Sequence, residues 1–123
     1  MYLLESTDLK GRSIRSVDVF GEENSVTTWT EALDTIAESI YNRNPDFIDK
    51  ISNEEWLSKI IRRDASAFST SVEILETGYF VDTGNDTNTK LRIINALGTL
   101  FGLTQDDIKA ELTADKHIEE DEG

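Results

Sequence analysis

Apolar side chains recur between Trp29 and Tyr41 with the spacing of an amphipathic α-helix. They form one stripe at positions i, i+4, i+7, i+8, i+11 and i+12, namely Trp29, Leu33, Ile36, Ala37, Ile40 and Tyr41. Thr28 and Glu31 have the N-cap and N3 spacing of a capping box. Pro45 ends the helix, because proline disfavours a helical backbone in the residue before it. The pattern predicts a first long helix over residues 29–41.

A second apolar stripe predicts another long helix, from about Thr89 to Phe101. Its buried side would consist of Leu91, Ile94, Leu97, Leu100 and Phe101. Gly102 follows as a C′ glycine, with Leu103 placed for the hydrophobic contact of that cap. Between the long helices, residues 46–51 predict a short helix with Asn44 as its N-cap. Residues 52–61 predict another, opened by the capping-box spacing of Ser52 and Glu55.

Two β-hairpins are predicted from β-branched runs and turn residues. Residues 12–20 favour a strand with a bulge between Ile14 and Val17, a turn at 21–24 and a returning strand at 25–28. Residues 65–77 favour another strand, with a turn at Thr77-Gly78 and a partner strand at 79–81. We therefore predict an α+β fold: a small, mainly antiparallel sheet from two hairpins, with two main helices packed on one face. Residues 1–113 would form a single domain and residues 114–123 an acidic mobile tail.

The residue types present exclude several kinds of site. The 123-residue chain has no cysteine, so disulfides and thiolate chemistry are excluded and a structural zinc site is not expected. Its one histidine, His117, lies in the acidic tail, which argues against a histidine-based metal site or catalytic dyad. No apolar run approaches the ~20 residues of a membrane helix, and the first residues lack the features of a signal peptide. We expect a cytoplasmic protein without a metal, a cofactor or a membrane partner.

The formal net charge of −13 narrows the choice of partner. Nonspecific binding to nucleic acid rests on neutralising phosphates, which an acidic chain opposes. We therefore expect a protein partner rather than direct binding to nucleic acid. The exposed edge strands of two hairpins would also allow a strand-paired homodimer.

Four short blocks follow one another along residues 12–103. They are Phe20-Gly21, residues 26–33, Ile40-Tyr41 with Pro45, and Tyr79-Phe80-Val81-Asp82-Thr83 before the last helix. Their order resembles that of a small, uncharacterised α+β module of prokaryotic proteins, similar to C-terminal appendages of restriction or nuclease-type proteins and to short stand-alone chains. The resemblance implies the fold and a defence or mobile-element setting, without an active site. Such modules often carry a basic segment before the second hairpin, of which this chain keeps Arg62-Arg63.

The segment from Asp82 to Asn88 is the one candidate for chemistry. Two apolar residues before Asp82-Thr83-Gly84 are typical of an aspartic-protease half-site, which would need Asp82 paired with its mate from a second chain. Asp82, Asp86 and Asn88 could also offer oxygen ligands to a hard cation, although the spacing is not that of an EF-hand. The alternative interpretation is a loop in which Asp82 forms a turn and the acids cap the following helix.

The interaction candidates are Trp56, Arg62 and Arg63, because aromatic and arginine side chains concentrate at interface hot spots. Our first hypothesis is a non-enzymatic protein–protein interaction domain. The first alternative is an acidic DNA mimic that inhibits a nucleic-acid-binding protein. It requires five acids to form a continuous stripe: Glu22, Glu23, Glu31, Asp34 and Glu38. The second alternative is an aspartic-type or metal-dependent hydrolase that uses the Asp82 loop.

Overall fold

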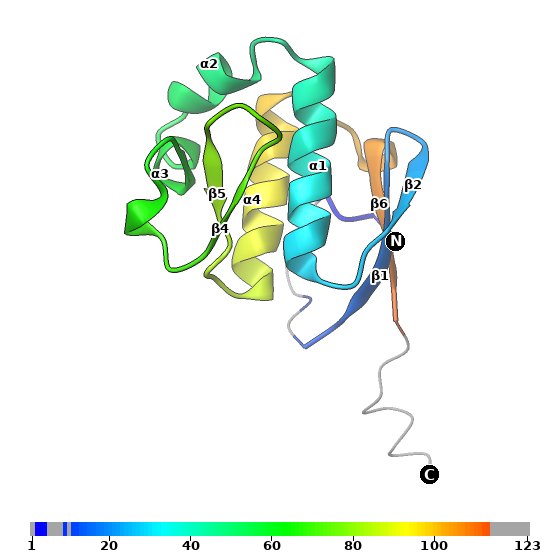
Figure 1. The fold of residues 1–123 in the computed structure, drawn as a ribbon. Helices are drawn as coiled ribbons and strands as arrows, with labels where there is room; N and C mark the ends of the chain where they lie inside the picture. Colours follow the sequence, from blue (N-terminus) through cyan, green and yellow to red (C-terminus); the bar gives the residue numbers. More distant parts are fainter. Residues whose placement is uncertain (1, 5–8, 10, 114–123) are drawn as a thin grey trace.

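The computed structural model describes residues 2–4, 9 and 11–113 of the chain, so the predicted tail lies outside the described residues. Two long helices, α1 (Trp29–Arg43) and α4 (Thr87–Leu100), pack against each other in the middle of the molecule. Figure 1 shows one small sheet on either side of this helix pair. The predicted α+β class is confirmed. The prediction placed both hairpins in one sheet, whereas the structure divides them between two antiparallel sheets of three strands each.

The first sheet has the order β2-β1-β6, formed by Glu22–Ser25, Ile14–Val19 and Ile108–Leu112. The predicted bulge is present as a register shift between Ile14 and Ser16. The predicted turn at 21–24 is wrong: Phe20 (φ 56°) and Gly21 (φ 84°) turn the chain, and the returning strand begins at Glu22. Strand β6 was not predicted, because it depends on pairing with β1 from the far end of the sequence.

The second sheet has the order β3-β5-β4, formed by Ile61–Arg62, Phe80–Asp82 and Ser71–Glu73. The long strand predicted over residues 65–77 is wrong. Residues 65–67 form a 3₁₀ turn, in which the Asp64 carboxylate accepts the Ser66 N–H, and the strand is confined to three residues. Ile61 and Val81 face each other across this sheet and are buried, which anchors its inner side to the core.

Helix α1 begins where its capping residues predict. The Glu31 N–H donates to the Thr28 hydroxyl oxygen at 3.1 Å, but the Glu31 carboxylate reaches back to the Thr27 N–H at 2.7 Å rather than to Thr28. The Trp29 indole is buried and donates from Nε1 to the Arg12 carbonyl oxygen at 2.8 Å, which ties the helix to the start of β1. Asn44 ends the helix: its N–H donates to the Tyr41 carbonyl oxygen.

Helix α4 also ends as predicted. Gly102 adopts φ 69°, its N–H donates to the Thr99 carbonyl oxygen, and the Leu103 N–H donates to the Gly98 carbonyl oxygen. This pair of bonds is a Schellman cap. The short helices α2 (Phe47–Ser52) and α3 (Leu57–Ile60) start later than predicted. The Glu54 carboxylate caps α3 by accepting the Leu57 N–H.

A single core lies between the helices and the inner sides of both sheets. Phe47 is fully buried there, stacked on Phe101 with ring centroids 5.3 Å apart and edge-on to Tyr41 at 5.8 Å. Figure 1 shows the loop joining β4 to β5 beside α1, and the Leu75 N–H of this loop donates to the Glu38 carboxylate of α1 at 3.4 Å.

Candidate functional site

The predicted acid site at Asp82 and Asp86 is built into the loop before α4. Asp82 is half-buried, and its carboxylate accepts the Gly84 N–H at 2.9 Å, as in an Asx turn. Asp86 is the N-cap of α4 and accepts the Thr89 N–H at 2.7 Å. Both carboxylates therefore have a local structural partner.

Lys90, in the first turns of α4, packs against the same loop and binds its backbone through the side-chain ammonium group. The side chain is only 6% exposed, and Nζ donates to the carbonyl oxygens of Thr83 at 3.1 Å and Asn85 at 2.5 Å. Burial lowers the pKa of Lys90, while Asp86 and Asp82 act in the opposite direction. In the part of the chain that the structure describes, no group of three or more Asp, Glu, His or Cys side chains is placed to hold a metal ion.

The three predicted interaction residues do not form one surface patch. Trp56 is half-buried, and the Arg92 guanidinium carbon lies 4.3 Å from the centre of its ring. Arg63 lies over the Tyr79 ring at 5.2 Å, and Arg62 is exposed on the short strand β3 opposite Phe80. A cationic side chain of the same chain therefore already lies over the Trp56 ring.

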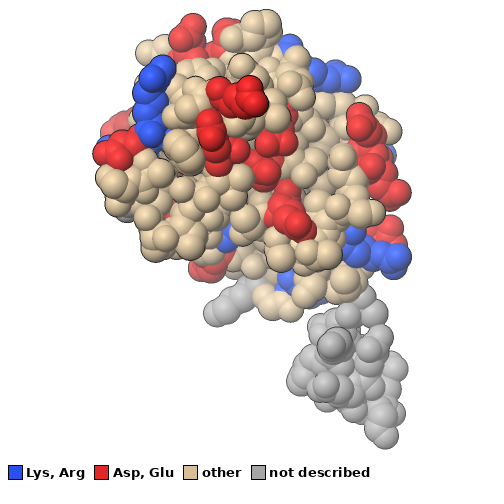
Figure 2. All heavy atoms as spheres, viewed as in Figure 1, with Lys and Arg blue, Asp and Glu red and all other residues tan. Residues whose placement is uncertain are grey.

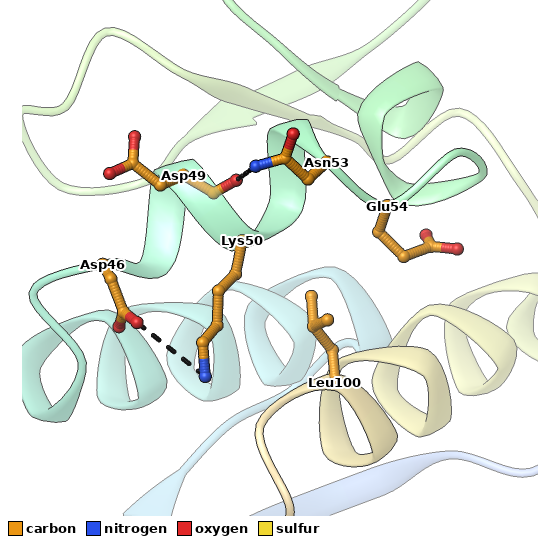
Figure 3. Close-up of a pocket in the computed structure, with 6 residues that line it drawn as sticks. All are labelled: Asp46, Asp49, Lys50, Asn53, Glu54 and Leu100. Carbon is orange, nitrogen blue, oxygen red and sulfur yellow. Dashed lines mark hydrogen bonds and ion pairs between the residues drawn. The ribbon is translucent and has the colours of Figure 1, made fainter.

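A surface hollow of about 330 Å³ lies between α2 and the last turn of α4 (Figure 3). It is lined by Asp46, Asp49, Lys50, Asn53, Glu54 and Leu100. Its polar groups do not converge: Lys50 is paired with Asp46 at 3.8 Å, and the Asp49 carboxylate points away from Lys50 and Leu100. The Glu54 carboxylate is held by its cap on α3, so the lining groups do not form one focused set of ligands.

Acidic side chains gather instead on α1 and the loop of the β4–β5 hairpin. Figure 2 shows them following one another across these elements, with no lysine or arginine among them. We call this surface the acidic face and define it by five carboxylates: Glu31, Asp34 and Glu38 on α1, with Glu73 and Glu76 on the hairpin, which the Glu38–Leu75 hydrogen bond joins to α1. The three helical acids are three and four residues apart, so they lie on one side of α1.

The five carboxylates of the acidic face form no ion pair with the lysines and arginines of the described residues. Among the residues that the structure describes, ion pairs join Arg15 with Glu111 at 3.4 Å and Lys50 with Asp46 at 3.8 Å, and neither pair includes an acid of this face. The Thr27 N–H and hydroxyl hold the pKa of Glu31 below its ordinary value. Glu38 accepts the Leu75 N–H at 3.4 Å, which joins α1 to the hairpin.

Asp34 is the most perturbed group of the acidic face. Burial, followed by the like charge of Glu38 and a side-chain hydrogen bond with it, raises the pKa of Asp34 from 3.8 to about 6. Its Oδ1 atom is shielded from solvent and has no hydrogen-bond partner. An acceptor in this state costs free energy until a donor or a proton reaches it.

Leu75 stands at the centre of the hairpin loop, between Glu73 and Glu76. It is 39% exposed and has φ 48°, in the left-handed region, where the Cβ of an L residue crowds the following carbonyl oxygen. The loop is nevertheless well held, since the Ile74 N–H donates to the Tyr79 carbonyl oxygen at 2.9 Å and Glu73 accepts the Gly78 N–H at 3.0 Å. The hairpin thus presents an apolar side chain on the acidic face.

Sequence reasoning did not single out Leu75, Glu73 or Glu76. One signal was available: Asp34 and Glu38 are like charges at i and i+4, a pairing that destabilises an isolated helix. The left-handed Leu75 carries no such signal, because leucine is not a typical turn residue.

Comparisons with protein-family models, with curated proteins and with solved structures find no match to this chain. Across the described residues, none of the helices has both the length and the apolar character needed to cross a membrane.

Proposed function

We propose that this chain is a non-enzymatic interaction domain whose acidic face binds a basic surface of a partner protein. The observation that carries the proposal is a group of five carboxylates that make no ion pair within the described part of the chain, next to the exposed Leu75. An apolar side chain surrounded by charges is a common arrangement at interfaces, where the apolar group gives affinity and the charges give selectivity and fast association. A cytoplasmic, prokaryotic defence setting remains a prediction.

The strain at Leu75 supports the same proposal. A glycine or an asparagine would adopt φ 48° at a lower cost, yet the chain carries an exposed leucine there. Strained residues concentrate at functional sites, where the surrounding structure holds them in place. Leu75 is exposed in the free protein, and a partner that covered it would bury its apolar surface.

A DNA mimic is the second candidate, because a nucleic-acid-binding protein is one kind of basic partner. Glu31, Asp34 and Glu38 rise along α1 by about 4.5 and 6 Å, compared with about 3.4 Å per phosphate on one DNA strand. The predicted stripe of five acids is divided, however, since Glu22 and Glu23 belong to β2 rather than to α1. The hydrolase alternative has less support, because the Asp82 carboxylate accepts a backbone N–H within the loop and the Asp86 carboxylate caps α4.

The test is a pull-down from the native host with three tagged baits. The first is the unchanged chain. The second carries Glu38→Lys and Glu76→Lys on the acidic face. The third carries Trp56→Ala and Arg62→Ala, the residues that the sequence singled out. We expect a stoichiometric partner with the first and third baits and its loss from the second.

A matched control carries Glu55→Lys and Asp106→Lys, which change the net charge equally at exposed positions away from the acidic face. It should keep the partner. Loss of the partner from the Trp56 and Arg62 bait alone would refute the proposed face. Competition by free DNA would identify the partner as a nucleic-acid-binding protein and move the DNA mimic to first place.

A further inference from the structure

Strand β4 forms an outer edge of the second sheet. In the order β3-β5-β4, β5 is the one described element that packs closely against it. The Thr83 N–H donates to the Thr70 carbonyl oxygen at 3.1 Å, and the Ile74 N–H donates to the Tyr79 carbonyl oxygen at 2.9 Å. Thr70, Val72 and Ile74 therefore turn their backbone groups toward β5, because hydrogen-bonded positions alternate along an antiparallel strand.

The residues between these positions turn their backbone groups away from β5. They are Ser71, Glu73 and Leu75. The Leu75 N–H donates to the Glu38 carboxylate of α1, but the distance of 3.4 Å is longer than that of an ordinary N–H···O bond. Ser71 is half-exposed and Glu73 is exposed, so this edge is open to solvent. An open edge of this kind is a template for a further strand.

The other edges of the two sheets are less suited to a further strand. By the same alternation Glu23 and Ser25 of β2 turn outward, but all four residues of β2 are polar. Strand β3 is only two residues long, and residues 2–3 lie along β6. Strand β4 has the half-buried Val72 and is followed by the exposed Leu75, so an added strand would find apolar contacts beside the backbone groups.

We propose that β4 accepts an extended segment of the partner protein as a fourth strand, with lysine or arginine at every second position of that segment. This inference rests on the proposed function and names the form of the partner. The added backbone would supply carbonyl oxygens to the Ser71 and Glu73 N–H groups. Because side chains alternate along a strand, the basic residues would share one face, beside Glu73 and its neighbours Glu38 and Glu76.

A second copy of this chain fits the same edge less well. Two β4 strands paired with each other would bring two acidic faces together, and like charges placed opposite each other destabilise a strand pair. The carboxylates of each copy form no ion pair with bases of the described residues that would reduce this repulsion. Charge complementarity therefore favours a basic segment of a different protein.

The test measures amide hydrogen exchange of the ¹⁵N-labelled chain with acetyl-Lys-Val-Lys-Val-Lys-Val-Lys amide as the probe. A control peptide of the same sequence is N-methylated at every residue, so it keeps the charge but cannot pair as a strand. At roughly nine-tenths occupancy by the first peptide, the Ser71 and Glu73 amides should exchange about tenfold more slowly, because exchange then occurs from the free fraction. The Glu23 and Ser25 amides of β2 should be unchanged, and the control peptide should protect none of the four.

The outcomes separate the two proposals. Equal protection of the β2 amides, or binding of both peptides without protection of Ser71 and Glu73, would overturn this inference alone, because a basic peptide would still bind. Failure of the first peptide to bind would also overturn it, and the pull-down with Glu38→Lys and Glu76→Lys would then decide the proposed function separately. Protection of the β4 amides that rises with protein concentration in the absence of peptide would identify a second copy as the occupant and overturn the assignment of a basic segment.

Discussion

Replacing Asp34 with asparagine should make the protein more stable at neutral pH, although the residue lies on the proposed binding face. Asparagine has nearly the same shape as aspartate and a similar helix propensity, so the main change is loss of a charge. In the folded protein that charge is half-buried beside Glu38, and its Oδ1 atom has no donor. The substitution removes the like-charge repulsion and the cost of desolvating a carboxylate.

The magnitude follows from the pKa of Asp34. A rise from 3.8 to about 6 corresponds to an upper limit of about 3 kcal/mol against folding when the group is ionised. Because about half of the side chain's environment is solvent, screening reduces this to about 1 kcal/mol. The folded protein binds more protons than the unfolded chain between pH 3.8 and 6. Stability therefore falls as pH rises through this interval, and the full penalty is present above pH 6.

The assay is urea unfolding of the unchanged chain and Asp34→Asn at pH 7.5, 6.5, 5.5 and 4.5. The variant should be about 1 kcal/mol more stable at pH 7.5, with the difference shrinking as the pH approaches 4. Glu55→Gln should change the free energy of unfolding by less than about 0.5 kcal/mol at every pH. A variant that is less stable at pH 7.5, or a constant difference across the pH range, would refute the reasoning about Asp34.

Three further substitutions test other parts of the structure by urea unfolding. Leu75→Asn should stabilise the free protein by about 1 kcal/mol, because asparagine tolerates φ 48° better, and should weaken capture of the partner. Lys90→Met should cost about 2 kcal/mol, because the carbonyl oxygens of Thr83 and Asn85 lose their buried donor. Gly102→Ala should cost about 1 kcal/mol, because an L side chain is disfavoured at φ 69° in the helix cap.

Each substitution has an outcome that would contradict its premise. Lys59→Met is the control for Lys90, since Lys59 is exposed, and equal effects of the two would show that the loop does not depend on the ammonium group. A Leu75→Asn variant that loses stability would mean that the leucine packs in the free protein. A neutral Gly102→Ala variant would show that the Schellman cap relaxes at little cost.

The long helices were predictable because their signals are local. Thr28 and Gly102 mark ends that depend on residues only a few positions away, and the structure places α1 and α4 accordingly. The sheets were harder, because β3 and β6 exist only through partners far along the chain. The first turn was misplaced because Phe20 adopts a positive φ, which is uncommon for an aromatic residue.

The acidic face was only partly visible in the sequence. Glu31, Asp34 and Glu38 could be placed on one side of a helix from their spacing alone. Their proximity to Glu73 and Glu76 depends on the tertiary contact between Glu38 and the Leu75 N–H. The prediction favoured Trp56 as an interaction residue because aromatic side chains concentrate at interface hot spots. In the structure the side chain is half-buried, and Arg92 from α4 lies over its ring.

The central claim is that the acidic face binds the partner. The most direct measurement is a ¹⁵N NMR titration of the labelled chain with the protein captured in the pull-down, following every backbone amide. The account predicts the largest changes at Glu31, Asp34, Glu38 and residues 73–78. Changes centred on residues 56–63, with the amides of α1 and the hairpin loop unaffected, would contradict it.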